Sequence, residues 1–294
     1  MTIPVVPGIA ALAADYDALI LDLWGVVHDG VAPYPGVLDC LARLRDAGKR
    51  VVILSNAPRR APCAVAVLRD MGIDDALYDR LVTSGDATRA AFESADDPWY
   101  AGLGRRYLFL GRPADADLLD GLGYEAVDDV AEADFVLNTG LVRRPGGAKG
   151  EVEDYEGVLR AAAGRRLPMA CANPDLVALR GGVREACAGA LAAAYTGLGG
   201  EVAYQGKPYP LVYELCFAAL PGVARRRVLA VGDALATDIA GAAAAGIDSL
   251  LVTGGLLADA WGVARESAPD AARLAAACAD AGVTPTAAAP TFVW

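Results

Sequence analysis

The sequence predicts an α/β protein with a doubly wound parallel-sheet core and an inserted α/β unit. Short apolar runs alternate with helical patterns over the first 93 residues, and the same rhythm returns in the last third of the chain. Between these parts, the stretch at 94–104 is polar and contains a proline and two glycines. Such alternation is typical of a parallel sheet covered on both faces, and such a break is typical of a domain boundary.

The core begins with the apolar run Asp17–Trp24, which we expect to form a buried strand that presents Asp22 at its carboxyl end. Gly48 and Gly72 each follow a helical pattern and are good helix stops. Ligands of a doubly wound sheet bind beyond the carboxyl ends of its strands, so Asp22 lies where a site is expected. The elements expected after the first strand are helices at 37–47, 62–71 and 86–93 and strands at 50–56 and 80–84.

A second set of elements fills the middle of the chain, and the first rhythm then resumes. The inserted elements are expected as strands at 107–111 and 134–140, helices at 116–121 and 153–164, and a basic, glycine-rich surface turn at 143–150. The elements expected after them are strands at 167–172, 201–205, 227–231 and 248–253 and helices at 185–198, 211–220 and 238–246.

Two domains are expected because 294 residues exceed one typical domain of roughly 100–200 residues. The predicted division is 1–85 with 168–294 for the core and 86–167 for the insert. The tail at 284–294 ends in aromatic residues, which we expect to pack on the core or on a second subunit.

Charge and cysteine usage narrow the function classes. The chain carries 26 basic and 37 acidic residues, a net charge of −11, so it lacks the basic footprint of a nucleic-acid-binding protein and must hold any phosphate locally. Its six cysteines form no C-x-x-C pair, which fits buried thiols in a reducing cytosol. Without a basic leader or an apolar run of about 18 residues, we expect a soluble, cytoplasmic protein with no membrane partner.

Polar side chains stand at the ends of four predicted strands. They are Asp22, Ser55, Lys207 and Asp233, and Asp238 follows close behind the last of them. A parallel sheet brings such ends to one edge, where converging carboxylates repel each other unless a cation neutralises them. Mg²⁺ accepts carboxylate oxygens together with a phosphate oxygen, and a carboxylate beside a bound phosphoryl group is a known class of nucleophile. The pattern therefore predicts a divalent-metal phosphate site centred on Asp22.

Each of these residues also has a simpler interpretation. A strand-end aspartate is more often a turn or helix-cap residue, because it accepts local backbone hydrogen bonds. Lys207 by itself is usually solvated, and Ser55 with Asn56 is a natural helix-capping pair. Only the order of the motifs along the chain favours the site.

That order resembles the haloacid-dehalogenase-like (HAD) hydrolase superfamily. The motifs are DLWGV after the first strand, LSN after the second, GKP at 206–208 and GDALATD at 232–238. The insertion between LSN and GKP, together with ANPD at 172–175, is similar to subclass IIA, the NagD-like group, in which a larger α/β cap interrupts a Rossmann-like core. The resemblance covers nearly the whole chain and implies a phosphatase of that group.

The resemblance also implies roles for the motif residues. Asp22 would be the nucleophile that forms an aspartyl-phosphate, Ser55 would hydrogen-bond the phosphoryl group, and Lys207 would pair with its charge. Asn56 would help to shape the phosphate loop. Magnesium would be held by the side chains of Asp22, Asp233 and Asp238 and by the backbone carbonyl of Trp24, with Asp238 as a direct ligand or as the group that orients its waters.

One position departs from the family's pattern. Phosphatases of the family carry a second aspartate two residues after the nucleophile as general acid and base, and this chain has Trp24 there. An indole N–H cannot titrate, so about 10²–10⁴-fold of rate depends on a replacement. The only histidine, His28, or its neighbour Asp29 is the hypothesised replacement, and a turn or interface role is the alternative for His28.

The leading interpretation is a Mg²⁺-dependent phosphatase for a small phosphorylated metabolite, with the insert as a cap that sets specificity. A catalytically weak phosphate binder and a phosphotransferase are the alternatives, and Trp24 is the feature that divides them. The sequence does not identify the cap residues that contact substrate, and hence does not identify the substrate. The sequence leaves the oligomeric state open, although members of the capped group often form dimers and the resemblance therefore favours a homodimer.

Overall fold

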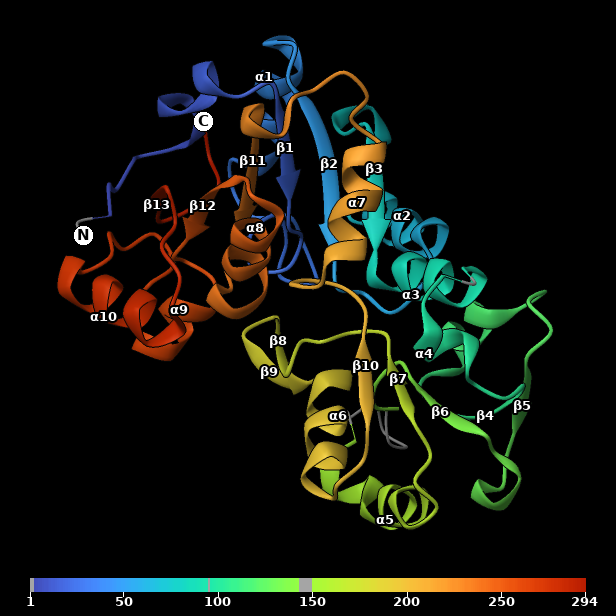
Figure 1. Cartoon of the computed structure of the whole chain (residues 1–294). Coiled ribbons are helices and arrows are strands. Elements are labelled where there is room, and N and C mark those ends of the chain that lie inside the picture. Colours follow the sequence, from blue (N-terminus) through green and yellow to red (C-terminus); the bar gives the residue numbers. More distant parts are fainter. Residues whose placement is uncertain (1–2, 95, 143–149) are drawn as a thin grey trace.

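Two parallel sheets, one above the other in Figure 1, organise the chain in a computed structural model that describes residues 3–94, 96–142 and 150–294. Every paired neighbour within the two sheets runs parallel. The core sheet contains, in spatial order, β13 (Ala287–Ala289), β12 (Asp248–Val252), β11 (Val228–Gly232), β1 (Ala18–Leu21), β2 (Arg50–Ser55) and β3 (Arg80–Thr83).

Alternating side chains of the central strand β1 separate the core into two layers. Leu19 and Leu21 belong to the apolar cluster under one pair of helices, whereas Ala18 and Ile20 belong to the cluster under the other pair. This alternation follows from the two-residue repeat of a strand. The first pair is α1 (Val37–Asp46) and α2 (Ala61–Asp70), and the second is α7 (Pro210–Ala218) and α8 (Ala240–Ala245). The predicted doubly wound architecture is confirmed.

The carboxyl-terminal segment packs on the core. Phe292 is only 1% exposed and joins the cluster that contains Leu19, and Trp294 packs against the same cluster. The expected contact of the aromatic tail with the core is therefore observed, while contact with a second subunit stays a prediction. Helices α9 (Leu256–Trp261) and α10 (Ala271–Ala281) also belong to the core. Helix α3 (Ser84–Glu93), most of which the sequence division placed in the insert, packs on β3 and α7 of the core and buries Ala91 and Phe92 against the second sheet.

The second unit, green to yellow in Figure 1, is a smaller α/β layer structure. Its sheet contains, in spatial order, β10 (Val202–Tyr204), β7 (Met169–Cys171), β6 (Phe135–Asn138), β4 (Arg106–Leu110) and β5 (Glu125–Val127). Its helices are α4 (Pro98–Ala101), α5 (Glu156–Gly164) and α6 (Ala188–Gly197). The helix expected at 116–121 is instead a 3₁₀ segment, η4 (Pro113–Leu119). Of the surface turn expected at 143–150, only Gly150 lies within the described residues.

Two strands belong to a different sheet from the one that the sequence division implied. The division assigned residues after 167 to the core, but β7 and β10 pair with each other and with β6 in the second sheet. The second unit therefore extends to about β10. A short run of small apolar residues can form a strand in either parallel sheet, and only the tertiary pairing shows which sheet it joins.

A hairpin that the sequence analysis missed extends from the second unit and contacts the core at Asp29 and Asp259. Strands β8 (Val177–Arg180) and β9 (Val183–Ala186) pair antiparallel around Gly181 and Gly182, whose φ angles of 53° and 77° favour glycine. The helix expected at 185–198 begins only at Ala188, because residues 183–186 form the second strand of this hairpin.

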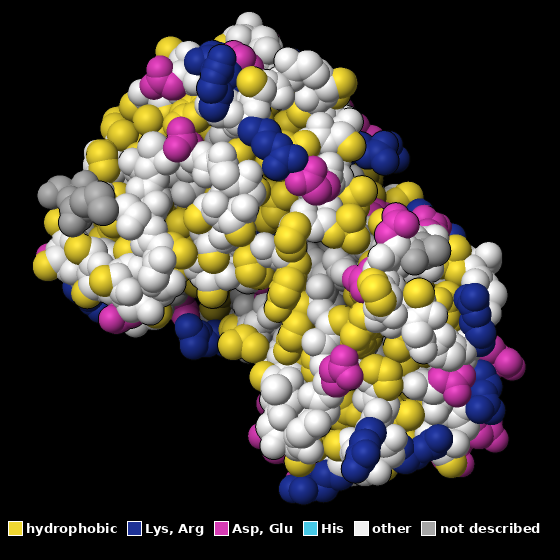
Figure 2. Space-filling model, viewed as in Figure 1, with side chains coloured by type: hydrophobic (Ala, Val, Ile, Leu, Met, Phe, Trp, Pro, Cys, Tyr) yellow, Lys and Arg dark blue, Asp and Glu magenta, His cyan; other side chains and the backbone are white. Residues whose placement is uncertain are grey.

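The carboxyl edges of the two sheets face each other. In the second sheet, Leu110, Asn138, Cys171 and Tyr204 are register partners at the strand ends. From Tyr204 the chain runs through two residues into Lys207, which lies at the core sheet, so the edge that follows these ends points toward the core (Figure 1). Figure 2 shows a notch between the larger body above and the smaller one below.

Within the described ranges, no helix combines the length and the apolar character needed to span a bilayer.

Candidate active site

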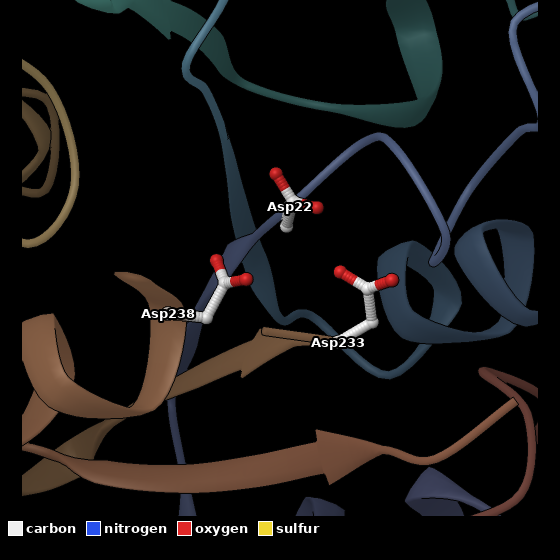
Figure 3. A group of neighbouring side chains, drawn as sticks. All are labelled: Asp22, Asp233 and Asp238. Carbon is white, nitrogen blue, oxygen red and sulfur yellow. The ribbon is translucent and has the colours of Figure 1, made fainter. Parts of the chain in front are cut away.

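Three buried carboxylates converge at the carboxyl edge of the core sheet. Asp22 follows β1, Asp233 follows β11, and Asp238 lies in the turn η8 (Leu235–Ile239). They are 6%, 5% and 4% exposed, and ligand oxygens of all three lie within 4.8 Å of one another. Figure 3 shows the three carboxylates pointing toward one another. The predicted convergence of these residues is what the structure shows.

Lys207 lies among these carboxylates. Its Nζ donates to Asp22 and, at 2.7 Å, to Asp238. Burial opposes its positive charge, but the attraction of Asp22 and then of Asp238 outweighs it and raises the pKa of Lys207 well above its usual range. The lysine therefore stays charged, and it neutralises one of the three carboxylates when all are ionised.

The remaining negative charge fits a divalent cation. Burial raises the pKa of Asp22 well above its usual range, with Lys207 opposing this shift and the other two aspartates adding to it. Burial, with repulsion from Asp238, raises the pKa of Asp233 to about 7. A cation beside these buried carboxylates would favour their ionised forms, and an all-oxygen donor set of this size suits a hard ion such as Mg²⁺.

Two glycines leave the space that the Asp233 side chain occupies. A side chain at Gly25 would bring its Cβ within 2.0 Å of the Asp233 carboxylate, and one at Gly255 would bring it within 1.9 Å. Gly25 also has φ of 75°, a left-handed conformation that favours glycine. The backbone N–H of Leu256 donates to the same carboxylate at 2.9 Å. Both close approaches require the absence of a side chain.

Asn56 holds the lysine loop and the end of β2 together. Its Oδ1 accepts from the backbone N–H of Lys207 at 2.7 Å, and its Nδ2 donates to the Lys207 carbonyl at 3.2 Å. Ser55 is fully buried at the end of β2, and its Oγ accepts from the backbone N–H of Ala57 at 3.2 Å. Ser55 lines an adjoining cavity with Trp24 and His28, rather than the cavity that contains Asp22.

Trp24 and His28 form one packed unit beside the carboxylates. Trp24 is half-buried, lines both cavities and meets the His28 ring edge-on, with 5.1 Å between ring centroids. His28 is 3% exposed, and its Nδ1 accepts from the backbone N–H of Gly30 at 2.9 Å. Burial lowers its pKa to about 4, so the ring is neutral at pH 7. Asp29 caps the loop by accepting from the N–H groups of Val31 and Ala32 at 2.8 and 2.9 Å.

Asp175 is the site residue to which sequence reasoning gave no role. It follows β7 and lines the same cavity as Asp22 and Lys207. Its Oδ1 accepts from Nδ2 of Asn56 at 2.8 Å, and burial raises its pKa, with Lys207 as the main opposing influence. The signal that points to it is its place three residues after a predicted strand end, within ANPD.

Arg265 supports the loop that follows β1 and Asp22, a role that no motif in the sequence indicates. One guanidinium nitrogen donates to the Gly25 carbonyl at 2.7 Å and to the Gly254 carbonyl at 3.0 Å. The guanidinium also lies over the ring of Tyr34, 3.3 Å from its centroid. Arg265 therefore links the two glycine-containing loops on either side of Asp233.

Comparison with known proteins places this architecture in a family. A family model described as haloacid dehalogenase-like hydrolase matches residues 19–125, and a HAD-hydrolase-like model matches residues 204–280. A haloacid dehalogenase-like hydrolase from Brucella suis 1330 has a similar crystal structure, with 34% identity, a TM-score of 0.82, and coverage of 98% of this chain and 100% of that one.

Two further similarities are to phosphatases of Mycobacterium tuberculosis. D-glycerol 3-phosphate phosphatase is 30% identical over 249 residues, which are 84% of this chain. The matched part spans only about two thirds, 65%, of that relative's length. The structure of a glycerol phosphate phosphatase in complex with magnesium has a TM-score of 0.62 at 29% identity and covers 83% of this chain and 69% of that one. Sequence and fold agree across these matches, and the chain belongs to the haloacid dehalogenase-like hydrolase family.

Proposed function

We propose that the protein is a Mg²⁺-dependent phosphatase that hydrolyses a small phosphomonoester through an aspartyl-phosphate on Asp22. The observation that carries the proposal is the buried cluster in which Lys207 and two further carboxylates surround the Asp22 carboxylate. Asp22, Asp233 and Asp238, with the backbone carbonyl of Trp24, would hold the cation. When bound, Mg²⁺ supplies positive charge that draws the phosphoryl oxygens toward the nucleophile and offsets their charge.

The reaction on these residues has two displacements. A carboxylate oxygen of Asp22 attacks phosphorus, the ester P–O bond breaks, and the leaving oxygen receives a proton. Water then attacks the phosphorus of the aspartyl-phosphate and returns a proton to the group that protonated the leaving oxygen, which releases phosphate and restores the Asp22 carboxylate. Lys207 offsets charge on the transferring group, Ser55 would donate to one of its oxygens, and Asn56 holds the lysine loop in place.

The proton for the leaving oxygen needs a titratable group, because the Trp24 indole cannot supply it. We propose Asp175, which lines the carboxylate cavity and whose pKa burial raises above its usual range, the direction that a proton donor needs. His28 is the second candidate. Its Nδ1 already accepts a hydrogen bond and its pKa is about 4, so the neutral ring would donate from Nε2 only weakly.

The substrate class is supported by the relatives. Hairpin residues Val177–Leu179 line the carboxylate cavity beside Asp22 and Lys207. The M. tuberculosis relative is named for glycerol 3-phosphate, a small phosphomonoester. A cytoplasmic location and a homodimer remain part of the proposal. The first is supported by the absence of any disulfide among the cysteines of the described residues.

A screen of phosphate esters with Mg²⁺, with Asp22→Asn as the inactive control, tests the proposal. Release of inorganic phosphate by the parent and not by the variant is the expected result. Saturable ligand binding without turnover of any ester would instead favour a phosphate-binding protein, which Trp24 makes the second candidate function. A phosphoenzyme that persists in water and transfers its phosphoryl group to an added alcohol would favour a phosphotransferase.

A further inference from the structure

A second cavity adjoins the carboxylate cavity and extends between the facing edges of the two sheets. The two cavities share Trp24 and Asp175. The far wall of the second cavity belongs to the smaller sheet, because Arg112 follows β4 and Thr139 follows β6. A leaving group attached to a phosphoryl group at Asp22 would therefore extend into this space.

Three arginines from three different elements line the second cavity. Arg59 lies in the loop after β2, Arg112 in the loop after β4, and Arg180 at the end of β8. Asp115, which is 1% exposed, accepts from Arg112 at 2.9 and 3.0 Å, while its closest approach to the Nε of Arg59 is 3.7 Å. Asp115 is thus hydrogen-bonded to Arg112, and it neutralises the guanidinium of Arg59 only in part.

Two polar atoms in this cavity have no partner among the described residues. They are the Nε of Arg59 and the Oγ1 of Thr139, and both atoms are buried. Burial, followed by repulsion from Arg112, lowers the pKa of Arg59. Asp175 and Glu185 also line the cavity, and Asp175 accepts from Asn56, which lines both cavities. Buried donors of this kind are nearly always satisfied, so their partner is expected from a ligand.

We propose that this cavity binds a second acidic group, a carboxylate or a phosphate, on the leaving group of the substrate. The inference rests on the proposed phosphatase function and deepens it, since it names the substrate class: small phosphomonoesters that carry a second anion. Arg59 would donate from its unpaired Nε, Thr139 from its hydroxyl, and Arg112 would add charge from the opposite sheet. Charge-assisted hydrogen bonds to guanidinium groups are the strong and geometrically selective kind.

Matched ester pairs test the proposal. 3-Phosphoglycerate and glycerol 3-phosphate differ only by a carboxylate against a hydroxymethyl group, and glucose 1,6-bisphosphate and glucose 6-phosphate differ by a second phosphate. We expect kcat/KM to favour the acidic member of at least one pair by about tenfold or more, and the pair that responds identifies the acidic group. Arg59→Gln should reduce that ratio by about tenfold, toward equal kcat/KM for the two members, because the charge-assisted bond is lost. Arg59→Lys should recover part of it.

The neighbouring arginine provides the control. Arg60 pairs with Asp86 at 3.5 Å and lines a different cavity, so Arg60→Gln should leave the ratio within about twofold of the parent. Equal kcat/KM within both pairs, or an unchanged ratio in Arg59→Gln, would overturn the inference. Because the readout is a ratio, a general loss of activity or stability in a variant does not imitate the effect.

Hydrolysis of p-nitrophenyl phosphate separates the two proposals. If the protein hydrolyses this ester without preferring the acidic substrates, only the proposed second anion site is ruled out. A protein that hydrolyses no ester loses the proposed function, and dissociation constants for the same two pairs, measured by calorimetry, then decide the anion site by the same ratio and the same Arg59→Gln comparison.

Discussion

The two carboxyl edges that face each other have the same architecture and opposite chemistry. The core edge presents the buried carboxylates of Asp22, Asp233 and Asp238. The edge of the smaller sheet presents Arg112 and Thr139. Both edges end parallel strands, so the fold alone does not select the chemistry; the residues that follow each strand do. Phosphoryl transfer is thereby proposed for the core edge and recognition of the rest of the substrate for the other edge. Asp175 is the exception, because it follows β7 of the smaller sheet and is proposed to supply a proton to the core edge.

The largest expected effect is the loss of phosphate release at the core edge. Asp22→Asn removes the proposed nucleophile, and kcat for phosphate release should fall by about 10⁴-fold or more. The amide has the same shape and still accepts from Lys207, so the fold should persist with little change in melting temperature. Phosphate release and thermal unfolding are the two measurements.

Asp46→Asn is the matched control for that variant, because this aspartate side chain is 76% exposed on the same core. It should change neither rate nor melting temperature. If Asp22→Asn retained the parent's rate, the core edge would have a binding function, and the contrast between the two edges would lose its catalytic half.

The next effect concerns proton transfer at the boundary between the edges. Asp175→Asn should lower kcat for an alkyl phosphate by about 10²-fold or more, because a general acid contributes about that much. The fall should be smaller for p-nitrophenyl phosphate, whose nitrophenolate leaves without a proton. His28→Ala should leave kcat for both esters near the parent value. The reverse pattern would assign the proton to His28 instead.

A double variant sharpens this result. Trp24→Asp places a carboxylate where the family carries its general acid, so it should restore much of the alkyl phosphatase rate to the Asp175→Asn protein. Failure of this rescue, with the fold intact by circular dichroism, would mean that Asp175 acts by positioning Asn56 rather than by moving a proton.

The affinity for Mg²⁺ should depend on pH because the buried carboxylates of the core edge titrate. The pKa of Asp233 is about 7, above its ordinary 3.8, so this group destabilises the metal-free fold progressively as pH rises from about 4 to 7. Mg²⁺ binds the ionised form and removes that penalty. The stabilisation by Mg²⁺, about 2.7 kcal/mol at 100 times its dissociation constant, should be large at pH 8.

At pH 5.5 a proton competes for the same carboxylate, so the dissociation constant of Mg²⁺ should rise by about tenfold or more. Thermal unfolding with and without Mg²⁺ at the two pH values measures this. An equal shift at both would show that protonation of the buried carboxylates is not linked to the metal.

The smallest effect concerns the hairpin between the edges. Arg184 of β9 pairs with Asp259 of α9 at 2.8 Å, but their side chains are 58% and 34% exposed. Such pairs contribute about 0–1 kcal/mol, so Arg184→Ala should reduce the free energy of unfolding by no more than that. Urea unfolding measures it. A loss of several kcal/mol would mean that the hairpin holds the two units together.

The sequence predicted the core and its carboxylates because their signals are local. Apolar runs such as Arg50–Asn56 and glycine helix stops mark each element. An aspartate at the end of a parallel strand, such as Asp22, lies at the carboxyl edge of the sheet, where ligands bind. The observed β2 differs from the expected strand by one residue. The order of the four motifs then gave the family.

Features that depend on tertiary pairing were not predictable in this way. The strand β7 is a three-residue apolar segment that fits either sheet, and only its partners assign it. The hairpin at 177–186 has a glycine turn, but its strands are partly exposed and lack a clear alternation. The residues around Arg59 in the sequence are those of a solvated arginine. Its unpaired Nε becomes apparent only in the structure, where the two units meet.

The path of the chain between the sheets determines where its length can vary. Only Gln205 and Gly206 separate β10 from Lys207. An insertion there would displace the lysine from its carboxylates. At the other edge of the same sheet, Gly121 and Gly123 precede β5 in open space, with no atom within 4 Å of the place that a side-chain methyl would occupy. Natural variation in cap size is therefore expected beside β5, with the crossing before Lys207 fixed in length.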